Sequence, residues 1–489
     1  MPNLNLGQTL DHHIGGRSYP PSSGEYLDDP APATGQLAGR IARGNAADVE
    51  AAVAAAQAAQ VGPWAETSVA ERADLLEAVA DAIESRVDEW AALESADTGK
   101  PISLARSIDI PRAISNFRFF AGAIRHSRSD MFPMAGALNY TLRKPVGTVG
   151  LITPWNLPLY LLSWKTAPAL AMGNTIVAKP SEVTPLTASA LAEVLTEVGL
   201  PPGVFNLVHG LGPEVGQPLV AHPRVRGISF TGGTATGARV AGTAAPLFKK
   251  LSLELGGKNA SVVFADADLE ATLDGVTRAG FANQGQICLC GSRILVEESI
   301  YEEFLAGLVK RVQALQVGDP SDHATQVGSL VGQAHREKVE GYVALAREEG
   351  GTVHCGGERP GGDLAAGAFL TPAVVSGLGQ DCRTVQEEIF GPVVTVQPFT
   401  DEAEALALAN GVRYGLAASV WTRDLARAHR FSAALDTGMV WVNTWLLRDL
   451  RVPFGGVKES GVGREGGHLS LEFFSESKNV CIYLGPGAR

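Results

Sequence analysis

The sequence predicts an α/β protein built from two doubly wound parallel sheets, each covered by helices. From residue 148 onward, short β-rich runs alternate with longer helix-like runs, and the alternation starts again after residue 255. The chain has 489 residues, enough for roughly three domains at about 150 residues each. Glycine contributes 56 residues, a share above the usual ~7%, which indicates many tight turns.

The first 120 residues contain three runs with the apolar spacing of helices, at 46–61, 69–85 and 103–124. The first run is rich in alanine, which is a strong helix former. We therefore expect a helical cap on the first domain.

The first doubly wound layer is expected to hold five strands with four helices between them. In such a layer the ligand binds beyond the carboxyl ends of the strands. The strands are expected at 148–153, 175–179, 204–209, 227–231 and 250–255, and the helices at 157–172, 185–198, 213–221 and 234–244.

A second α/β unit begins at residue 260. Two further strand-like segments, 137–143 and 480–484, have no place in either sheet. Because exposed strand edges pair readily with another chain, these two segments predict a subunit interface. The second unit is expected to contain a helix at 269–283 and strands at 260–264, 293–296, 374–375, 393–397 and 417–421.

Charge and hydropathy argue against nucleic acid and membranes as partners. The chain has 40 basic and 52 acidic residues, a net charge of −12, so it lacks the positive excess that attracts phosphate backbones or anionic lipids. The first 20 residues lack the basic cluster and apolar run of a targeting signal. The apolar stretch 146–164 is interrupted by Pro154, Asn156 and Pro158, unlike a membrane-spanning helix. We expect a soluble cytoplasmic protein.

Cysteine 288 is the first candidate for chemistry. It lies in the run NQGQICLCGSR at 283–293, a glycine-containing turn after a helix, where a thiol can face a cleft as a nucleophile. The alternative is a small buried hydrophobic residue, the usual role of a free cysteine. Five cysteines in so long a chain form no disulfide framework and fit a reducing compartment. Cys290 is expected to pack, and Cys355, Cys382 and Cys481 are expected to be structural.

Two polar residues at strand ends are further candidates. Glu254 ends an apolar strand, where a carboxylate either forms a salt bridge or serves as a general base with a raised pKa. Asn156 lies between two prolines that fix the backbone. Its amide either caps a turn or donates to a developing oxyanion.

A glycine-rich segment at 230–237, FTGGTATG, follows a strand and opens a helix, as phosphate-binding segments do. The segment 210–216 spaces its glycines differently from a dinucleotide fingerprint, and we interpret it as a turn. The sequence contains no Walker A motif, no Gly-x-Ser-x-Gly elbow and no His-Glu-x-x-His metal motif. No metal is expected.

Taken together, these motifs resemble those of the NAD(P)-dependent aldehyde dehydrogenases over essentially the whole chain. The motifs occur in one order: PWNLP, IVAKPSE, FTGGTATG, LELGGK, NQGQICLC, EEIFGP and PFGGVKESGVGRE. The resemblance implies an aldehyde dehydrogenase-like fold with a small β oligomerisation element and a homodimer or homotetramer. It implies an NAD-binding domain at 1–122 and 146–254, a catalytic domain at 255–455, and oligomerisation strands at 123–145 and 474–489.

The resemblance also implies the chemistry. Cys288 attacks the aldehyde, and the Asn156 amide and the Cys288 backbone N–H hold the thiohemiacetal oxyanion. After hydride transfer, Glu254 activates the water that hydrolyses the thioester to the acid. A coenzyme A acylating enzyme is disfavoured because this base is present.

The resemblance further implies a set of NAD contacts. A carboxylate at Glu182 accepts hydrogen bonds from ribose hydroxyls and repels a 2′-phosphate, so NAD should bind better than NADP. Gly233 departs from relatives that carry a side chain able to contact the pyrophosphate. The implied cofactor residues are Thr153, Pro154, Trp155, Lys179, Ser181, Glu182, Phe230, Gly232, Gly233, Thr234, Gly237, Leu255, Glu388 and Phe390.

Within the family, the runs at 109–112, 116–120, 156–165, 281–290 and 443–450 resemble those of the 2-aminomuconic and 2-hydroxymuconic semialdehyde dehydrogenases. Such substrates carry a carboxylate, which two arginine forks can bind. The implied substrate residues are Arg112 and Arg448, with Leu157, Leu161, Trp164, Ile287, Leu289, Trp445 and Phe454 as apolar walls.

Alternatives remain open for the substrate end. Arg112 could instead pair with Asp109 on its own helix, and Arg451 competes with Arg448. The same chemistry could act on a dicarboxylate semialdehyde, an aliphatic or a betaine-type aldehyde. A relative without turnover, kept as a structural or binding protein, is the alternative from another class. The residues do not separate a 2-amino from a 2-hydroxy substrate.

Overall fold

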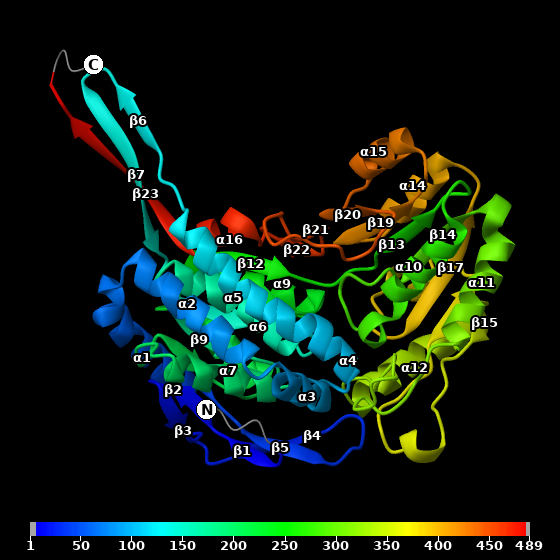
Figure 1. Ribbon diagram of the computed structural model, residues 1–489, viewed down its shortest axis with the longest axis horizontal. Helices are drawn as coiled ribbons and strands as arrows, with labels where there is room; N and C mark the ends of the chain where they lie inside the picture. Colours follow the sequence, from blue (N-terminus) through cyan, green and yellow to red (C-terminus); the bar gives the residue numbers. More distant parts are fainter. Residues whose placement is uncertain (1–5, 486–489) are drawn as a thin grey trace.

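Eight strands form the larger sheet of the computed structural model, which describes residues 6–485 (Figure 1). Its order is β22-β12-β11-β8-β9-β10-β2-β3, and the five strands from β12 to β10 run parallel. These five confirm the predicted layer. The bounds are β2 (His12–Ile14), β3 (Arg17–Tyr19), β8 (Thr148–Ile152), β9 (Thr175–Lys179), β10 (Phe205–Leu207), β11 (Gly227–Thr231), β12 (Lys250–Glu254) and β22 (Gly461–Val462).

The first 42 residues contain five short strands that the sequence patterns do not indicate. β2 and β3 form a hairpin that extends the large sheet, with Gly15 and Gly16 in the left-handed region at its turn. The other three, β1 (Gln8–Leu10), β4 (Tyr26–Pro30) and β5 (Leu37–Ala42), form a separate sheet. Strands of three to six residues are too short to show a period, and here tertiary pairing decides their conformation.

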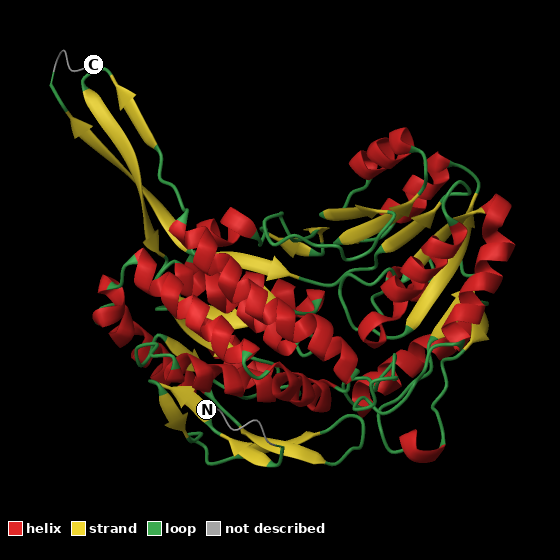
Figure 2. Ribbon diagram, viewed as in Figure 1, coloured by secondary structure: helices red, strands yellow, loops and turns green. Residues whose placement is uncertain are grey.

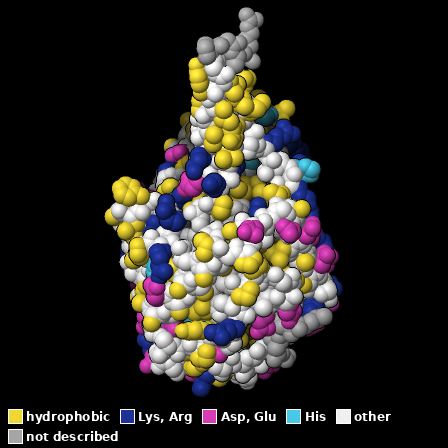
Figure 3. Space-filling view, turned by 90° about the vertical axis from the view of Figure 1, so that its left-hand side faces the viewer, with side chains coloured by type: hydrophobic (Ala, Val, Ile, Leu, Met, Phe, Trp, Pro, Cys, Tyr) yellow, Lys and Arg dark blue, Asp and Glu magenta, His cyan; other side chains and the backbone are white. Residues whose placement is uncertain are grey.

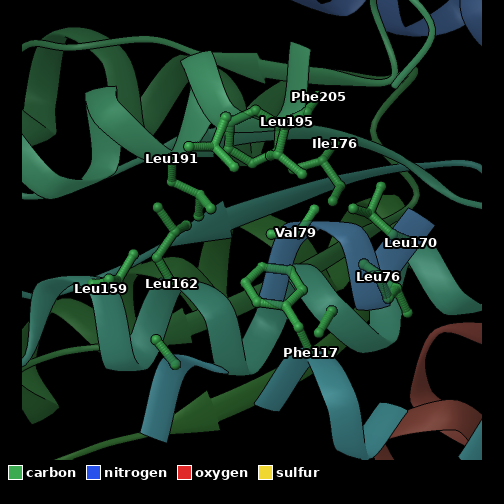
Figure 4. Packing of buried hydrophobic residues seen from close by; sticks show 14 of the residues in the cluster. Leu76, Val79, Phe117, Leu159, Leu162, Leu170, Ile176, Leu191, Leu195 and Phe205 are labelled. Carbon is green, nitrogen blue, oxygen red and sulfur yellow. The ribbon is translucent and has the colours of Figure 1, made fainter. Parts of the chain in front are cut away.

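Helices cover both faces of the large sheet because its side chains alternate between two apolar clusters. Leu151 and Ala178 point into one cluster, while Ile152 and Val177 point into the other. Figure 4 shows the first cluster, where Phe117, Leu162 and Leu191 meet between the helices and the sheet. Its helices are α2 (Val69–Glu84), α3 (Val87–Thr98), α5 (Ile110–Arg125), α6 (Pro158–Ala171) and α7 (Leu186–Glu197), and those of the second are α1 (Ala46–Gln60), α8 (Gln217–Ala221) and α9 (Thr234–Ala244).

Local sequence sets the start of the amino-terminal helices. Asn45 and Asp48 form a reciprocal capping box at α1, and Ser68 and Glu71 form one at α2. The predicted helices at 46–61 and 69–85 are therefore confirmed. The predicted helix at 103–124 is also confirmed, since α4 (Ile102–Leu104), a π-helical turn over Ala105–Asp109 and α5 follow one another without a break.

The second sheet has seven strands in the order β15-β16-β17-β14-β13-β19-β20, and only the edge strand β15 is antiparallel. The alternation confirms a second doubly wound unit, since Val263 and Val296 face one helix layer while Val262 and Leu295 face the other. The strands are β13 (Ala260–Val263), β14 (Arg293–Glu297), β15 (Thr352–Cys355), β16 (Ala373–Ser376), β17 (Val393–Phe399), β19 (Ala417–Trp421) and β20 (Met439–Val442). The helices are α10 (Leu269–Phe281), α11 (Tyr301–Gln313), α12 (Gln333–Glu348), α13 (Arg383–Gln386), α14 (Glu402–Asn410) and α15 (Leu425–Ala434).

Three strands form an arm that projects from the body and contains no helix (Figures 1 and 2). β6 (Met131–Met134), β7 (Ala137–Pro145) and β23 (Ser475–Tyr483) pair in the order β23-β7-β6. The two strand-like segments singled out in the sequence thus pair with each other. Residues 1–5 and 486–489 of the predicted domain ranges lie outside the described residues. Remaining short elements are α16 (Gly467–Phe473), β18 (Tyr414–Gly415) and β21 (Val457–Lys458).

Within residues 6–485, no helix combines the length and the apolar character needed to cross a bilayer. The same residues contain no group of three or more His, Cys, Asp or Glu side chains arranged to hold a metal ion.

Candidate active site

A cavity of about 870 Å³ opens at the carboxyl ends of β8, β9, β11 and β12, where a doubly wound sheet binds its ligand. Residues of the second unit, including Cys288 and Glu388, form its opposite wall. Of the cofactor residues named from the sequence, twelve line it: Thr153, Pro154, Trp155, Lys179, Ser181, Glu182, Phe230, Gly232, Gly233, Leu255, Glu388 and Phe390.

Thr234 and Gly237 lie behind the cavity wall instead of forming it. The Thr234 hydroxyl donates to the Glu459 carbonyl at 3.3 Å. A side chain at Gly237 would meet Leu255 at 2.4 Å, so this glycine allows α9 to pack closely against the end of the sheet. Thr236 takes the place at the cavity that the sequence suggests for Thr234.

The amino end of α9 fits a phosphate group. Gly233 is the residue before α9, and no side chain caps the free N–H groups of the first turn of this helix. The space beside Gly233 is open, since nothing lies within 4 Å of a side chain built there. A pyrophosphate can therefore accept backbone N–H bonds at this end of the cavity.

The position of Glu182 at the cavity wall also suits the binding of a ribose. Lys179, at the end of β9, donates from Nζ to Glu182 Oε2 at 2.7 Å, and the Glu182 side chain is about one third exposed. The ion pair keeps one carboxylate oxygen fixed and leaves the other to accept a hydroxyl. The residues present thus fit a dinucleotide such as NAD.

Three rings pack at the far end of the cofactor side. The Trp155 ring lies 5.0 Å from His335 and 5.2 Å from Phe390, both edge to face. Phe390 adopts a left-handed backbone, with φ of 61°, and its carbonyl lies 2.7 Å from His335 Nε2. Glu388, just before it, accepts the Gly257 N–H at 2.9 Å, and burial raises the pKa of this carboxyl.

An unusual loop presents Cys288. Asn283, Gln284 and Gly285 have φ of 51°, 56° and 70°, three left-handed residues in succession that end the helix direction of α10. Such backbone is costly for residues other than glycine and persists only where the surroundings hold it. Here the Asn259 amide donates to the Cys288 carbonyl at 2.7 Å, so the thiol is held at the cavity wall.

Glu254 is buried and Cys288 is partly buried at the cavity wall, and both favour their protonated forms. Burial, with Glu388 and Glu254 nearby, raises the pKa of the Cys288 thiol. Burial and the neighbouring Glu465 raise the pKa of Glu254 well above its usual value, although Lys165 and Arg448 oppose the shift. Neither oxygen of Glu254 has a hydrogen-bond partner. A carboxyl in this environment is a strong base once it is ionised.

Asn156 joins the first sheet to the Cys288 loop. Its amide Nδ2 donates to the Gln286 carbonyl at 2.8 Å, two residues before Cys288. Its own carbonyl accepts from Lys100 Nζ at 3.0 Å, and Lys100 is fully buried and ion-paired with Asp109. This network orients the amide toward the nucleophile, and the second Nδ2 proton remains available as a donor.

Arg448 lies at the substrate end with most of its donors unused. Its guanidinium carbon lies 4.5 Å from the Trp164 ring and 4.0 Å from the Phe454 ring. Its Nη1 donates to the Tyr160 hydroxyl at 2.9 Å, whereas its buried Nε and Nη2 have no partner. Because buried donors without partners are costly, this arrangement is suited to an anion.

The other two candidate arginines, Arg451 and Arg112, do not line the cavity. Arg451 is exposed and pairs with Asp449 at 2.9 Å, so it does not compete for the cavity. Asp109 pairs with Lys100 and not with Arg112. The Arg112 guanidinium faces the Tyr160 ring at 5.7 Å but lies outside the cavity lining.

Most of the apolar walls named from the sequence line a cavity. Trp164 does not, because it is 1% exposed and packs beneath Arg448. Trp445 lines a second cavity of about 590 Å³ on the far side of Leu157. Leu157, Leu161, Ile287, Leu289 and Phe454 line the first cavity.

Several lining residues were not identified from the sequence. Tyr160 lies three residues after Leu157 on α6, so helical spacing could have indicated it. His335 and Lys338 lie on α12, where no motif points to them. The segment interpreted as a turn at 210–216 is in part a helical turn, Gly212–Gly216, that lines the cavity, so that interpretation is wrong.

The chain is similar to known proteins over nearly its whole length. The model of the aldehyde dehydrogenase family matches residues 19–480. The chain is 49% identical over 482 residues to a 2-aminomuconic semialdehyde dehydrogenase of Danio rerio, covering 97% of this chain and 98% of that one. It is 48% identical over 483 residues to a 2-hydroxymuconic semialdehyde dehydrogenase of Pseudomonas sp. (strain CF600), covering 97% and 99%. The NAD+ complex of a Bacillus cereus aldehyde dehydrogenase superposes with a TM-score of 0.95 at 39% identity, covering 98% and 97%.

Proposed function

Because the chain belongs to the aldehyde dehydrogenase family, it is an oxidoreductase that oxidises aldehydes with NAD, and we propose that its substrate is a muconic semialdehyde. The substrate class is that of 2-aminomuconic and 2-hydroxymuconic semialdehydes, which the named relatives use. The observation that carries this choice is Arg448, whose buried Nε and Nη2 have no partner in a cavity that also contains Cys288. A substrate carboxylate would supply the missing acceptors.

We propose the catalytic roles from the positions of three side chains. Cys288 Sγ attacks the aldehyde carbon, and its proton passes to a base, for which the unpartnered Glu254 carboxylate is suited. The Asn156 amide donates to the oxyanion of the resulting thiohemiacetal. Bound NAD supplies the two-electron oxidant that converts this species to a thioester. Glu254 releases the proton it received to solvent and then takes a proton from the water that attacks the thioester; the Cys288 thiolate leaves, and the acid is released.

The cofactor contacts of the preceding section are likewise proposed. The free N–H groups at the start of α9 hold the pyrophosphate, Glu182 binds the adenosine ribose, and Glu388 binds the nicotinamide ribose. The negative charge of Glu182 disfavours the 2′-phosphate of NADP.

The experiment that tests the substrate compares 2-hydroxymuconic semialdehyde with hexanal, for the wild type, Arg448→Ala and Arg451→Ala. NADH formation gives kcat/KM for each pair. We expect a strong preference for the carboxylate substrate that falls by on the order of 10²-fold in Arg448→Ala, as loss of a charge-assisted pair predicts. Arg451→Ala, which removes an exposed arginine paired with Asp449, should leave the preference unchanged. Equal turnover of both aldehydes would favour an aliphatic substrate instead.

We propose that the arm builds a homo-oligomer, a homodimer or a homotetramer. Figure 3 shows apolar side chains along the projecting arm. An exposed apolar surface of this kind on a long strand pair is suited to pairing with a second copy. The exposed large apolar residues of the arm and its end are Met131, Phe132, Met134, Leu142, Ile482, Tyr483 and Leu484.

We also propose the domain limits given by the resemblance, 1–122 and 146–254 for cofactor binding, 255–455 for catalysis, and 123–145 and 474–489 for the arm. The free state of all five cysteines supports a reducing compartment such as the cytoplasm.

A further inference from the structure

We propose that Tyr160 is a substrate-binding residue that fixes Arg448 and decides specificity for a carboxylate, an inference that rests on the proposed function. Tyr160 lies on α6 and is 8% exposed. Its phenolic oxygen accepts from Arg448 Nη1 at 2.9 Å, and its ring faces the Arg112 guanidinium at 5.7 Å. One side chain thus contacts both arginines that the sequence assigns to the substrate.

Tyr160 also lies at the boundary between the two cavities. The cavities of about 870 and 590 Å³ share four lining residues, Leu157, Tyr160, Ile287 and Leu289. Tyr160 is the only one of these four with a polar side-chain atom. A substrate that extends from Cys288 toward the second cavity therefore meets one hydroxyl among aliphatic groups.

The chemistry of this hydroxyl complements that of the arginine. A phenol has one proton to donate and two lone pairs, and Arg448 occupies one lone pair. The O–H proton remains available, next to the unpartnered Nε and Nη2 of Arg448. A carboxylate can accept from the guanidinium fork and the phenol together, which favours an anionic chain end over a methyl group.

Fixing Nη1 has a second consequence. A guanidinium that is held on one side by a hydrogen bond and on its faces by Trp164 and Phe454 has few orientations left. Less conformational freedom is then lost when the substrate binds. Tyr160 acts both by contact and by positioning.

The test measures kcat and KM with two aldehydes, hexanal and its carboxylate-bearing counterpart adipate semialdehyde, and the inhibition of hexanal oxidation by adipate. Tyr160→Phe keeps the ring and removes the hydroxyl, whereas Tyr160→Leu removes both. Tyr26→Phe is the matched control, because it deletes one exposed phenol bonded to Asp11 at 2.7 Å. Circular dichroism and thermal unfolding check that each variant folds.

For Tyr160→Phe we expect KM for adipate semialdehyde and the inhibition constant for adipate each to rise about 10-fold, as loss of a bond to a charged group predicts. Its kcat, and both constants for hexanal, should stay within about twofold, and Tyr160→Leu should lose more. An unchanged KM in Tyr160→Phe, or equal losses for hexanal, would overturn the inference. If Arg448→Ala abolishes the carboxylate preference while Tyr160→Phe does not alter it, this inference alone fails. If the wild type shows no preference, the proposed substrate fails with it.

Discussion

The two ends of the main cavity differ in how their charged groups are satisfied. On the cofactor side, Lys179 pairs with Glu182 at 2.7 Å, and Glu388 accepts the Gly257 N–H at 2.9 Å. On the substrate side, both oxygens of Glu254 and two donors of Arg448 are buried without partners. The carboxylates of Glu182 and Glu388 on the cofactor side therefore already have protein partners, whereas Glu254 and Arg448 on the substrate side do not.

This difference places a free-energy cost at the substrate side, where buried polar groups have no partner until the substrate binds. An unpaired buried polar group costs of order 1–3 kcal/mol, and more when it is charged. A substrate that supplies the missing partner recovers that cost, and one that lacks it does not. The substrate side should thus discriminate strongly, and the cofactor side should respond weakly to single changes.

The largest expected effect is that of Cys288→Ala, which should sharpen the comparison by separating the two sides. Loss of the nucleophile should lower kcat by on the order of 10⁴-fold or more. Because the Cys288 side chain is not among the proposed NAD contacts, the dissociation constant of NAD should change by less than about twofold. Steady-state rates and calorimetric NAD binding measure the two quantities. A large loss of NAD affinity would show that the two sides are not independent.

Glu254→Gln comes next and tests the role of the unpartnered carboxyl. A base must be ionised, and the pKa of Glu254 is raised well above its usual value by burial and by Glu465. In the wild type, thioester hydrolysis should therefore rise with pH through that raised pKa and level off above it. Glu254→Gln should lower the steady-state rate by about 10²- to 10⁴-fold and remove this rise.

The readout for Glu254→Gln is a pre-steady-state burst of NADH measured across pH. A burst that survives while steady-state turnover is lost assigns the residue to hydrolysis. Loss of the burst as well assigns it to activation of the thiol. A variant that turns over at the wild-type rate would contradict the role of base.

A smaller effect is expected from Glu182→Gln on the cofactor side. Removing the negative charge should raise the kcat/KM for NADP relative to NAD by about 10-fold, because the repulsion of a 2′-phosphate by a nearby partly exposed charge is of order 1–4 kcal/mol. Rates with each cofactor at fixed substrate measure the ratio. Glu50→Gln, which alters an exposed ion pair with Arg224 outside the cavity, is the control.

The sequence predicted the two sheets, and it named candidate catalytic residues, because both leave local patterns. Strand and helix alternation is local, and the proline-flanked segment around Asn156 and the glycine-containing segments around Glu254 and Cys288 are each short runs of consecutive residues. The contact between Tyr160 and Arg448 joins positions 288 residues apart, and no local pattern contains it. Other features also depend on contacts between distant parts of the chain, which no local pattern contains. They are the pairing of the short strands β2 and β3, the places of His335 and Lys338 at the cavity, and the packing of Trp164 against Arg448.

The smallest expected effect is that of His335 on NAD binding. It tests whether the cofactor side of the cavity, unlike the substrate side, contains no charge that waits for its ligand. Burial lowers the pKa of His335 to about 4, so the imidazole is neutral at ordinary pH. The imidazole packs against the Trp155 ring, and its Nε2 lies 2.7 Å from the Phe390 carbonyl. Its role is therefore to hold the Trp155 and Phe390 rings in place. The affinity for NAD should therefore be constant between roughly pH 6 and 8, the range in which an unperturbed histidine titrates.

His335→Gln should weaken NAD binding by less than about fivefold, in line with the modest energy of edge-to-face ring contacts. Calorimetry at several pH values measures both effects. An affinity that rises as the pH falls through this range would mean that a protonated imidazole binds the anionic pyrophosphate, and the cofactor side would then also leave a charge for its ligand to satisfy.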